Sequence, residues 1–329
     1  MAHRKIEEEI ERLAQVCRPS SGSGPSPAAT AALRKALGDR VNLMVAKAAK
    51  LAGELRVEEL LPDLLAAFDR LMEKPVERDP QCWGKNAIAT ALVALDYRES
   101  ARFLRGARHI QMEPVWGGEA DTAATLRGIC LLALPSCTDL RREEILRCLV
   151  DALTERAHTV RLEAARAIAQ MEGDEAPLLL RLKARVGDEE SEVVGQVFDS
   201  LLRLESAGAL PFLGGFLQSK KEELREEAAL ALGASRLPAA VELLREALAA
   251  ARDPQFRGVL MRALSASRQP AAIELLLDLL RNGRPADSTA ALAALELHRE
   301  TPAIWQTVVA AMDSKASGGW RGQSAERKL

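Results

Sequence analysis

The sequence predicts an all-α fold, a solenoid of about eight antiparallel helix pairs. Composition is the first observation. Hydrophobic residues make up 48% of the chain but aromatic residues only 3%, and Tyr97 is the sole tyrosine. Such an Ala- and Leu-rich mixture favours helices that pack closely at small residues, whereas a β-sandwich or barrel needs β-branched and aromatic side chains. The second observation is a repeat of 31 to 33 residues, which is typical of helical arrays.

The repeat is visible when the second half of the chain is aligned with itself. One alanine column has successive differences of 33, 31, 32 and 31 residues: Ala176, Ala209, Ala240, Ala272 and Ala303. Eight positions earlier lies an aliphatic column: Ile168, Leu201, Leu232, Leu264 and Leu295. A small residue precedes each of these: Ala167, Ser200, Ala231, Ala263 and Ala294. Three columns in register over five units identify a structural repeat.

Each unit is predicted to form two short helices. In VRLEAARAIAQM (160–171) the apolar residues recur at helical spacing and form one stripe. A turn containing Gly and Pro follows, and APLLLRLKARV (176–186) forms the second helix. One such pair cannot bury its apolar face alone, so neighbouring pairs must stack into a continuous core.

The segment VRLEAARAIAQMEGDEAPLLLRL (160–182) resembles the HEAT-repeat consensus, and more narrowly the short HEAT-like or phycobilisome-lyase-type repeat. The resemblance is close over 160–312 and looser over 41–155. It implies a right-handed superhelix of antiparallel helix pairs, with protein binding along the curved surface. Such a motif specifies a fold much better than it specifies a function.

The chain is expected to have four parts. An N-terminal helix covers 1–17, where Glu7, Glu8, Glu9 and Glu11 form a solvated face or, alternatively, a docking surface. A Pro-, Gly- and Ser-rich linker covers 18–27 and ends at Ser26-Pro27, an N-cap and first helical residue. The solenoid covers 28–312, irregular over 41–155 and regular over 160–312. A flexible tail covers 313–329.

Charge and cysteine content limit the functional classes. The formal net charge is -2, so the chain has no general attraction for nucleic acid or anionic membrane. The five cysteines show no tight pair, which favours reduced thiols and a cytoplasmic location. No apolar run approaches the roughly 20 residues that span a bilayer. We therefore expect a protein with no membrane contact.

No catalytic signature is present. The sequence has no glycine-rich phosphate loop, HExxH, GxSxG, EF-hand loop or zinc-binding cysteine pair. The four histidines are scattered, and His298 occupies a helix-turn column where a structural role is expected. We predict no catalytic residues, no metal and no cofactor.

One segment, residues 105–128, interrupts the repeat and is rich in polar side chains. Pro114 and Gly117-Gly118 prevent a helix there, so the sequence predicts a long irregular connection, a common place for binding sites. The candidate site residues are Arg105, Arg108, His109, Gln111, Glu113, Trp116, Asp121 and Arg127.

Two interpretations of this segment stay open. In the first, Trp116 and the arginines contact a ligand or partner, because a guanidinium can donate two parallel hydrogen bonds to a carboxylate or phosphate. In the second, the segment is an inter-repeat plug. Trp116 then fills a gap in the core, Asp121 caps the following helix, and arginines pair with Glu99, Glu113 or Glu119. Trp83 and Lys85 could belong to the same surface.

The function expected from these features is a non-catalytic scaffold or adaptor that binds another protein, whose identity the sequence does not reveal. A DNA-binding or DNA-repair protein is an alternative. It would need a continuous basic row, and the row that begins with Arg181, Lys183 and Arg185 is replaced by acidic residues in later repeats. Nucleic acid is therefore not the expected partner. A bilin lyase-like factor is the third alternative, suggested by the repeat type alone.

Overall fold

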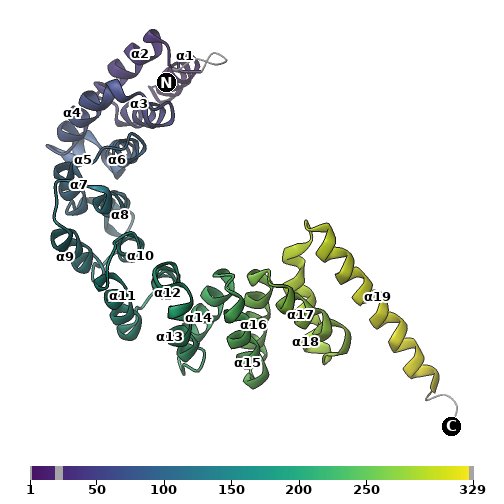
Figure 1. The fold of residues 1–329 in the computed structure, drawn as a ribbon. Helices are drawn as coiled ribbons and strands as arrows, with labels where there is room; N and C mark the ends of the chain where they lie inside the picture. The colour runs from purple at the N-terminus through teal and green to yellow at the C-terminus, as the bar shows by residue number, and fades with distance from the viewer. Residues whose placement is uncertain (1, 19–24, 326–329) are drawn as a thin grey trace. The chain divides into compact units, whose positions relative to one another are not determined.

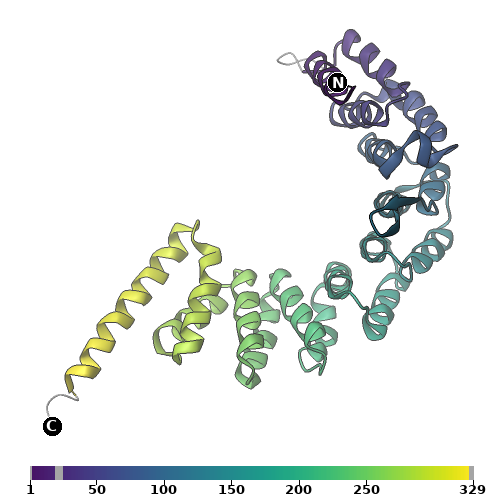
Figure 2. The same cartoon turned by 180° about the vertical axis from the view of Figure 1, so that it is seen from behind.

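The structure is a computed structural model that describes residues 2–18 and 25–325, with side chains described over 6–18 and 25–313. It is helical almost throughout, as the sequence predicts, and it divides into two compact units, Met1–Met171 and Glu172–Leu329 (Figures 1 and 2). Within the described residues, no helix is long and apolar enough to cross a membrane.

The first unit contains ten α-helices among the described residues: α1 Ala2–Val16, α2 Pro27–Leu37, α3 Asn42–Glu54, α4 Leu61–Leu71, α5 Pro75–Arg78, α6 Trp83–Ala94, α7 Ser100–Ala107, α8 Ala124–Ala133, α9 Arg142–Ala152 and α10 His158–Ile168. A hairpin of two short strands, β1 Met112–Val115 and β2 Gly118–Asp121, lies between α7 and α8. Helices α3, α6, α8 and α10 stack successively into one layer, and α4, α7 and α9 form the second (Figure 1).

The second unit contains nine further helices among the described residues: α11 Glu175–Val186, α12 Ser191–Glu205, α13 Leu210–Phe216, α14 Glu222–Ala234, α15 Pro238–Ala250, α16 Pro254–Ser267, α17 Pro270–Asn282, α18 Pro285–Leu295 and α19 Pro302–Ala325. Here α12, α14, α16 and α18 stack on one another, and each packs against the helix that follows it. Proline begins α15, α16, α17 and α18, where its missing N–H has no helical partner to lose.

The repeat columns form the core of the stack. The aliphatic column from Ile168 to Leu295 is fully buried, and so is the alanine column from Ala176 to Ala272. Ala303, in α19, is the exposed member of that column. Small residues are needed where first helices meet: a Cβ at Gly233 would collide with the Ala263 carbonyl. The register read from the sequence is therefore the packing register.

The predicted helix cap at Ser26, the buried His298 and the reduced cysteines are all present in the structure. Ser26 Oγ accepts the Ala29 N–H at 3.2 Å, and Pro27 begins α2, which confirms that cap. His298 is buried with Nε2 3.0 Å from the Ser265 carbonyl oxygen, which confirms its structural role. All five cysteines are free thiols.

The two ends of the chain lie partly outside the described residues. Most of the predicted linker, residues 19–24, lies outside the described residues, as do residues 326–329. Helix α19 continues to Ala325, so the structure makes most of the expected tail helical. A further difference concerns residues 112–121, which form an antiparallel hairpin instead of an irregular connection.

Candidate functional site

The hairpin that interrupts the repeat is closed by the two residues Trp116 and Gly117. Val115 pairs with Gly118, and Gly117 has φ of +91°, a left-handed conformation that favours glycine. That value at the third position fits a type II turn, whose second position points outward at the corner. Trp116 occupies this corner, and its relative exposure is 103%. The turn therefore places the indole in solvent.

Alternate residues of the preceding strand point in the opposite direction, into the body of the first unit. Gln111 and Glu113 are buried, whereas Ile110, Met112 and Val115 are exposed. The two-residue period of an extended chain separates Gln111 and Glu113 from Ile110 and Met112, whereas Val115, which has the register of the buried pair, is exposed at the end of the strand. Gln111 and Glu113 therefore anchor the hairpin, while Ile110, Met112 and Trp116 expose apolar side chains.

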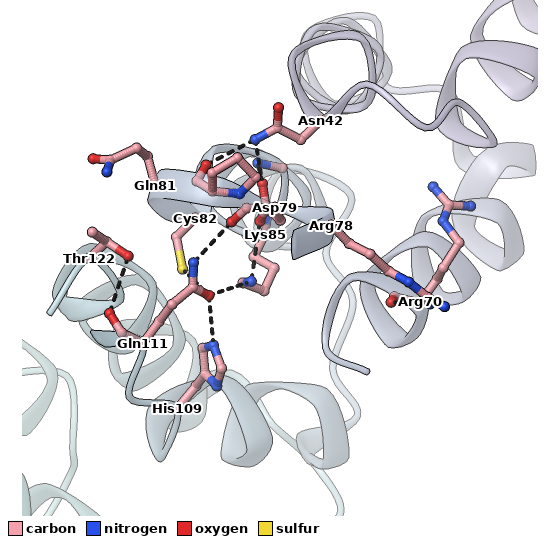
Figure 3. Close-up of polar contacts among 12 residues, drawn as sticks. Asn42, Arg70, Arg78, Asp79, Gln81, Cys82, Lys85, His109, Gln111 and Thr122 are labelled. Atoms are coloured by element: carbon pink, nitrogen blue, oxygen red, sulfur yellow. Dashed lines mark hydrogen bonds and ion pairs between the residues drawn. The ribbon is translucent and has the colours of Figure 1, made fainter. Parts of the chain in front are cut away.

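Gln111 is the centre of the anchor (Figure 3). Its Oε1 accepts a hydrogen bond from Lys85 Nζ at 2.7 Å and lies 3.1 Å from His109 Nε2. Cys82 Sγ is a third donor, at 3.3 Å. The amide Nε2 donates to the Asp79 carbonyl oxygen at 3.0 Å and to Glu113 Oε1 at 2.6 Å. One side chain thus joins the hairpin to α6.

Asp79 organises the start of α6. Its carboxylate accepts the N–H groups of Gly84 at 2.8 Å and Lys85 at 2.9 Å, which the first helical turn would otherwise leave without partners. Asn42 of α3 donates to the same carboxylate at 3.0 Å. Lys85 Nζ lies 3.4 Å from Asp79 Oδ2, and both side chains are fully buried. The ion pair is consequently held inside the protein on all sides.

Glu113 accepts a hydrogen bond from the strained backbone at Gln81 and Cys82. Gln81 and Cys82 have φ of 62° and 55°, in the left-handed region that non-glycine residues rarely adopt. Glu113 Oε1 accepts the Gln81 N–H at 2.7 Å and the Thr122 hydroxyl at 2.5 Å. Burial opposes ionisation of Glu113, but the hydrogen bonds outweigh it and hold its pKa below the ordinary value.

Arg127 and Asp121 close the other end of the anchor. Arg127 Nη2 lies 2.7 Å from Asp121 Oδ2, and Nη1 donates to the His109 carbonyl oxygen at 2.9 Å. Asp121 Oδ1 also accepts the N–H of Ala123, just before α8, at 3.0 Å. Burial alone would raise the pKa of Asp121, but the hydrogen bonds from Arg127 and the backbone have the larger effect, so its pKa lies below the ordinary value. His109 is half-buried, and burial lowers its pKa.

The structure brings five of the eight candidate residues into this network: His109, Gln111, Glu113, Asp121 and Arg127. Three lie elsewhere. Arg105 on α7 pairs with Asp69 of α4 at 3.1 Å, Arg108 lines a depression beside α9, and Trp116 is at the hairpin tip.

Other members of the network were not predicted: Asp79, Cys82 and Thr122. The available signal in the sequence was the position of Asp79, an acidic residue shortly before the start of α6. Lys85 was expected at a surface and is instead buried, because Asp79 and Gln111 supply its partners.

The plug interpretation describes the base of the hairpin but not its tip. Asp121 does accept an N–H at the start of α8, as that interpretation requires. Trp116 fills no gap in the core, however, and Arg105 and Arg127 pair with Asp69 and Asp121 instead of Glu99, Glu113 or Glu119. Arg127 Nε is buried without a hydrogen-bond partner, but the other polar side chains named here bond to one another or to the backbone. Among the described residues no group of three metal-ligating side chains is present.

Comparison with known proteins agrees with the fold. Residues 178–265 match the family described as HEAT repeats, so this part of the solenoid is built from HEAT repeats. No curated protein matches the sequence.

Three solved structures show low overall similarity. Human deoxyhypusine hydroxylase in complex with glycerol is 20% identical, with 81% of this chain and 98% of that chain covered and a TM-score of 0.31. The Escherichia coli protein YibA is 13% identical, with 88% and 97% covered and a TM-score of 0.44. The CpcE–CpcF complex of phycocyanin lyase from Nostoc sp. is 19% identical, with 91% and 98% covered and a TM-score of 0.32.

Proposed function

We propose that this chain is a non-catalytic scaffold that binds another protein, and that the hairpin 112–121 is one of its contact elements. The observation that carries the proposal is the complete exposure of Trp116 at the tip of an ordered turn. Tryptophan is among the residues that contribute most when a protein interface buries them. A large apolar side chain held in water is unfavourable unless a partner covers it.

The geometry of the base supports this role. Binding is weakened when a contact loop must be ordered, and a loop that is already ordered avoids that loss. Bonds to Gln111, Glu113 and Asp121 tie the hairpin to α6 and α8. Ile110, Met112 and Val115 are further exposed apolar side chains in or next to the first strand of the hairpin. The hairpin therefore offers a preorganised patch of the kind that protein partners recognise.

The experiment is site-specific photo-crosslinking from position 116 in the cell, followed by capture with Trp116→Ala. We expect one principal crosslinked protein, and loss of its capture by W116A without a lower melting temperature. The control is Leu297→Ala, which truncates another exposed apolar side chain, 58% exposed, far along the sequence. L297A should retain the partner. No crosslinked protein at position 116, or equal capture by W116A and wild type, would refute the proposal.

The DNA-binding alternative receives less support. Arg181 pairs with Glu205 at 2.5 Å and Lys183 with Asp188 at 2.7 Å, so two of the three cations that begin the basic row are already neutralised. Phosphate binding needs cations that can replace the counterions of the duplex. Salt-sensitive duplex binding by the purified chain would restore this alternative. The lyase-like alternative and the absence of catalysis stay predictions, and uptake of colour from added bilin tests the former.

A further inference from the structure

A second place in the first unit has the features of a small-ligand site, and it is independent of the hairpin. A depression of about 440 Å³ lies between α7, α8 and α9, helices that neighbour one another in Figure 1. Pockets that hold small molecules usually start at about 300 Å³. Leu104, Leu131 and Leu140 contribute an apolar part to its lining.

The charged residues of the depression divide into those that the protein already neutralises and those that it does not. Glu144 is bonded to Arg141, with Arg141 Nε at 3.2 Å and its N–H at 3.0 Å. Glu155 lies 3.9 Å from Arg127. Among the described residues, Arg108, Arg147 and Asp151 form no ion pair of this kind, although all three line the depression.

The contrast with nearby cations makes this distribution informative. On α7, Arg102 and Arg105 share Asp69 at 2.9 and 3.1 Å, and Arg127 of α8 pairs with Asp121 at 2.7 Å. Arg108 and Arg147 are exposed and line the same depression, so an external anion can reach both, and Asp151, which is also exposed, can meet an external cation. Arginine suits a carboxylate because its planar fork can donate two hydrogen bonds to it.

Cys148 also lines the depression, where charges of both signs act on its thiol. Burial raises the pKa of its thiol, the Arg108 cation opposes that rise, and the Asp151 carboxylate adds to it. Both charges thus act on the same sulfur. Arg147 and Asp151 are four residues apart on α9, so they project from the same side of that helix.

We propose that the depression binds a small zwitterion, a free amino acid with an aliphatic side chain. Arg108 and Arg147 bind its carboxylate, Asp151 binds its ammonium group, and the leucines surround its side chain. The arrangement matches opposite charges on one small molecule, which neither a simple anion nor a simple amine would satisfy.

Alkylation of Cys148 in the full-length protein tests the proposal at the site itself. The other four cysteines are buried and Cys148 is partly exposed, so iodoacetamide should modify Cys148 first. Mass spectrometry then follows the modified peptide with and without leucine, isoleucine, valine or methionine. We expect at least one of them, at a concentration about ten times its Kd, to slow alkylation about tenfold, because only the ligand-free protein then reacts. No protection by any of the four overturns the proposal.

Two leucine analogues separate recognition of the two charges. 4-Methylpentanoate lacks the ammonium group, and 3-methylbutylamine lacks the carboxylate. Each should protect Cys148 less than leucine does. Protection by 4-methylpentanoate that equals that by leucine would mean an anion site without ammonium recognition, and this overturns the zwitterion.

Variants identify the residues that bind. Arg108→Gln and Arg147→Gln remove one cation each, and Asp151→Asn removes the carboxylate while keeping its shape. Each should reduce the ratio of alkylation rates without and with ligand, a ratio that cancels any change in the reactivity of Cys148 itself. Arg156→Gln is the matched control, because Arg156 is exposed outside the depression. Undiminished protection in R147Q and D151N would refute the assigned contacts, whatever the result at the hairpin.

Discussion

At the scale of single residues, the most consequential feature is a fully buried ion pair. Lys85 and Asp79 have no exposed side-chain surface, and each has further hydrogen bonds that compensate its charge. A charge of this kind is tolerated in the interior only while its partner is present. The attraction within the pair therefore affects stability less than the loss of one partner would, because that loss leaves an unpaired charge in the interior.

Lys85→Met tests that argument. Methionine fills a similar volume but leaves the Asp79 carboxylate buried without its cation, which typically destabilises a protein by about 3 kcal/mol or more. We expect the free energy of unfolding, measured with urea, to fall by that order. Lys74→Met is the control, because Lys74 and Glu77 form an exposed pair worth at most about 1 kcal/mol. Similar losses in the two variants would contradict the interpretation.

A small residue at a helix junction makes a second residue-scale prediction. Ala263 is fully buried and its backbone lies directly against Gly233 of the preceding first helix. Ala263→Leu should overpack this junction and destabilise the protein by about 1–3 kcal/mol. Thermal unfolding followed by circular dichroism measures the loss. A melting temperature equal to that of the wild type would show that the junction is looser than the structure indicates.

At the scale of elements, the hairpin depends on charges that change with pH. His109 has a lowered pKa, so the folded state binds fewer protons than the unfolded chain below pH 6.5, the ordinary value for histidine. Glu113 and Asp121 also have lowered pKa values, and their contribution is present above their unfolded values and falls away as the pH drops through the folded ones. All three groups therefore favour a more stable anchor at neutral pH.

Acidification should consequently destabilise the anchor. Stability falls wherever the unfolded state binds more protons, so the wild type should lose unfolding free energy between pH 7 and about pH 5 through His109. His109→Gln keeps a polar side chain but does not titrate, and its loss over the same interval should be smaller. Urea unfolding at several pH values measures both. If the free energy of unfolding had the same pH dependence in wild type and H109Q, His109 would not be the group responsible.

At the scale of the whole molecule, the chain divides into two compact units, each built from stacked helix pairs. Each first helix packs mainly on the next one, so stability accumulates through neighbouring pairs and requires no single central core. The unit Met1–Met171 contains the hairpin, its anchor and the depression beside α9. Both proposed contact sites are therefore properties of that unit.

A fragment of residues 1–171 should then fold without the rest of the chain. We expect cooperative unfolding and a circular dichroism spectrum with the helicity of α1–α10, because the contacts of the hairpin anchor all lie inside this unit. Amide exchange should show protection at Thr122, whose N–H donates to the Gln111 carbonyl oxygen at 2.9 Å. A fragment without cooperative unfolding would show that the second unit is needed to support the first.

The sequence by itself determined the helical fold and its packing register. Residues such as Leu232 and Ala240 recur at the repeat length and are buried at the same place in successive pairs, because helical periodicity and residue size are local properties. Only the tertiary structure decided the site. Gln111 and Asp79 are 32 residues apart, and their bond depends on how α6 and the hairpin pack. Polar partners at such separations leave no periodic trace, and for the same reason the sequence could not show that Lys85 is buried while Trp116 is exposed.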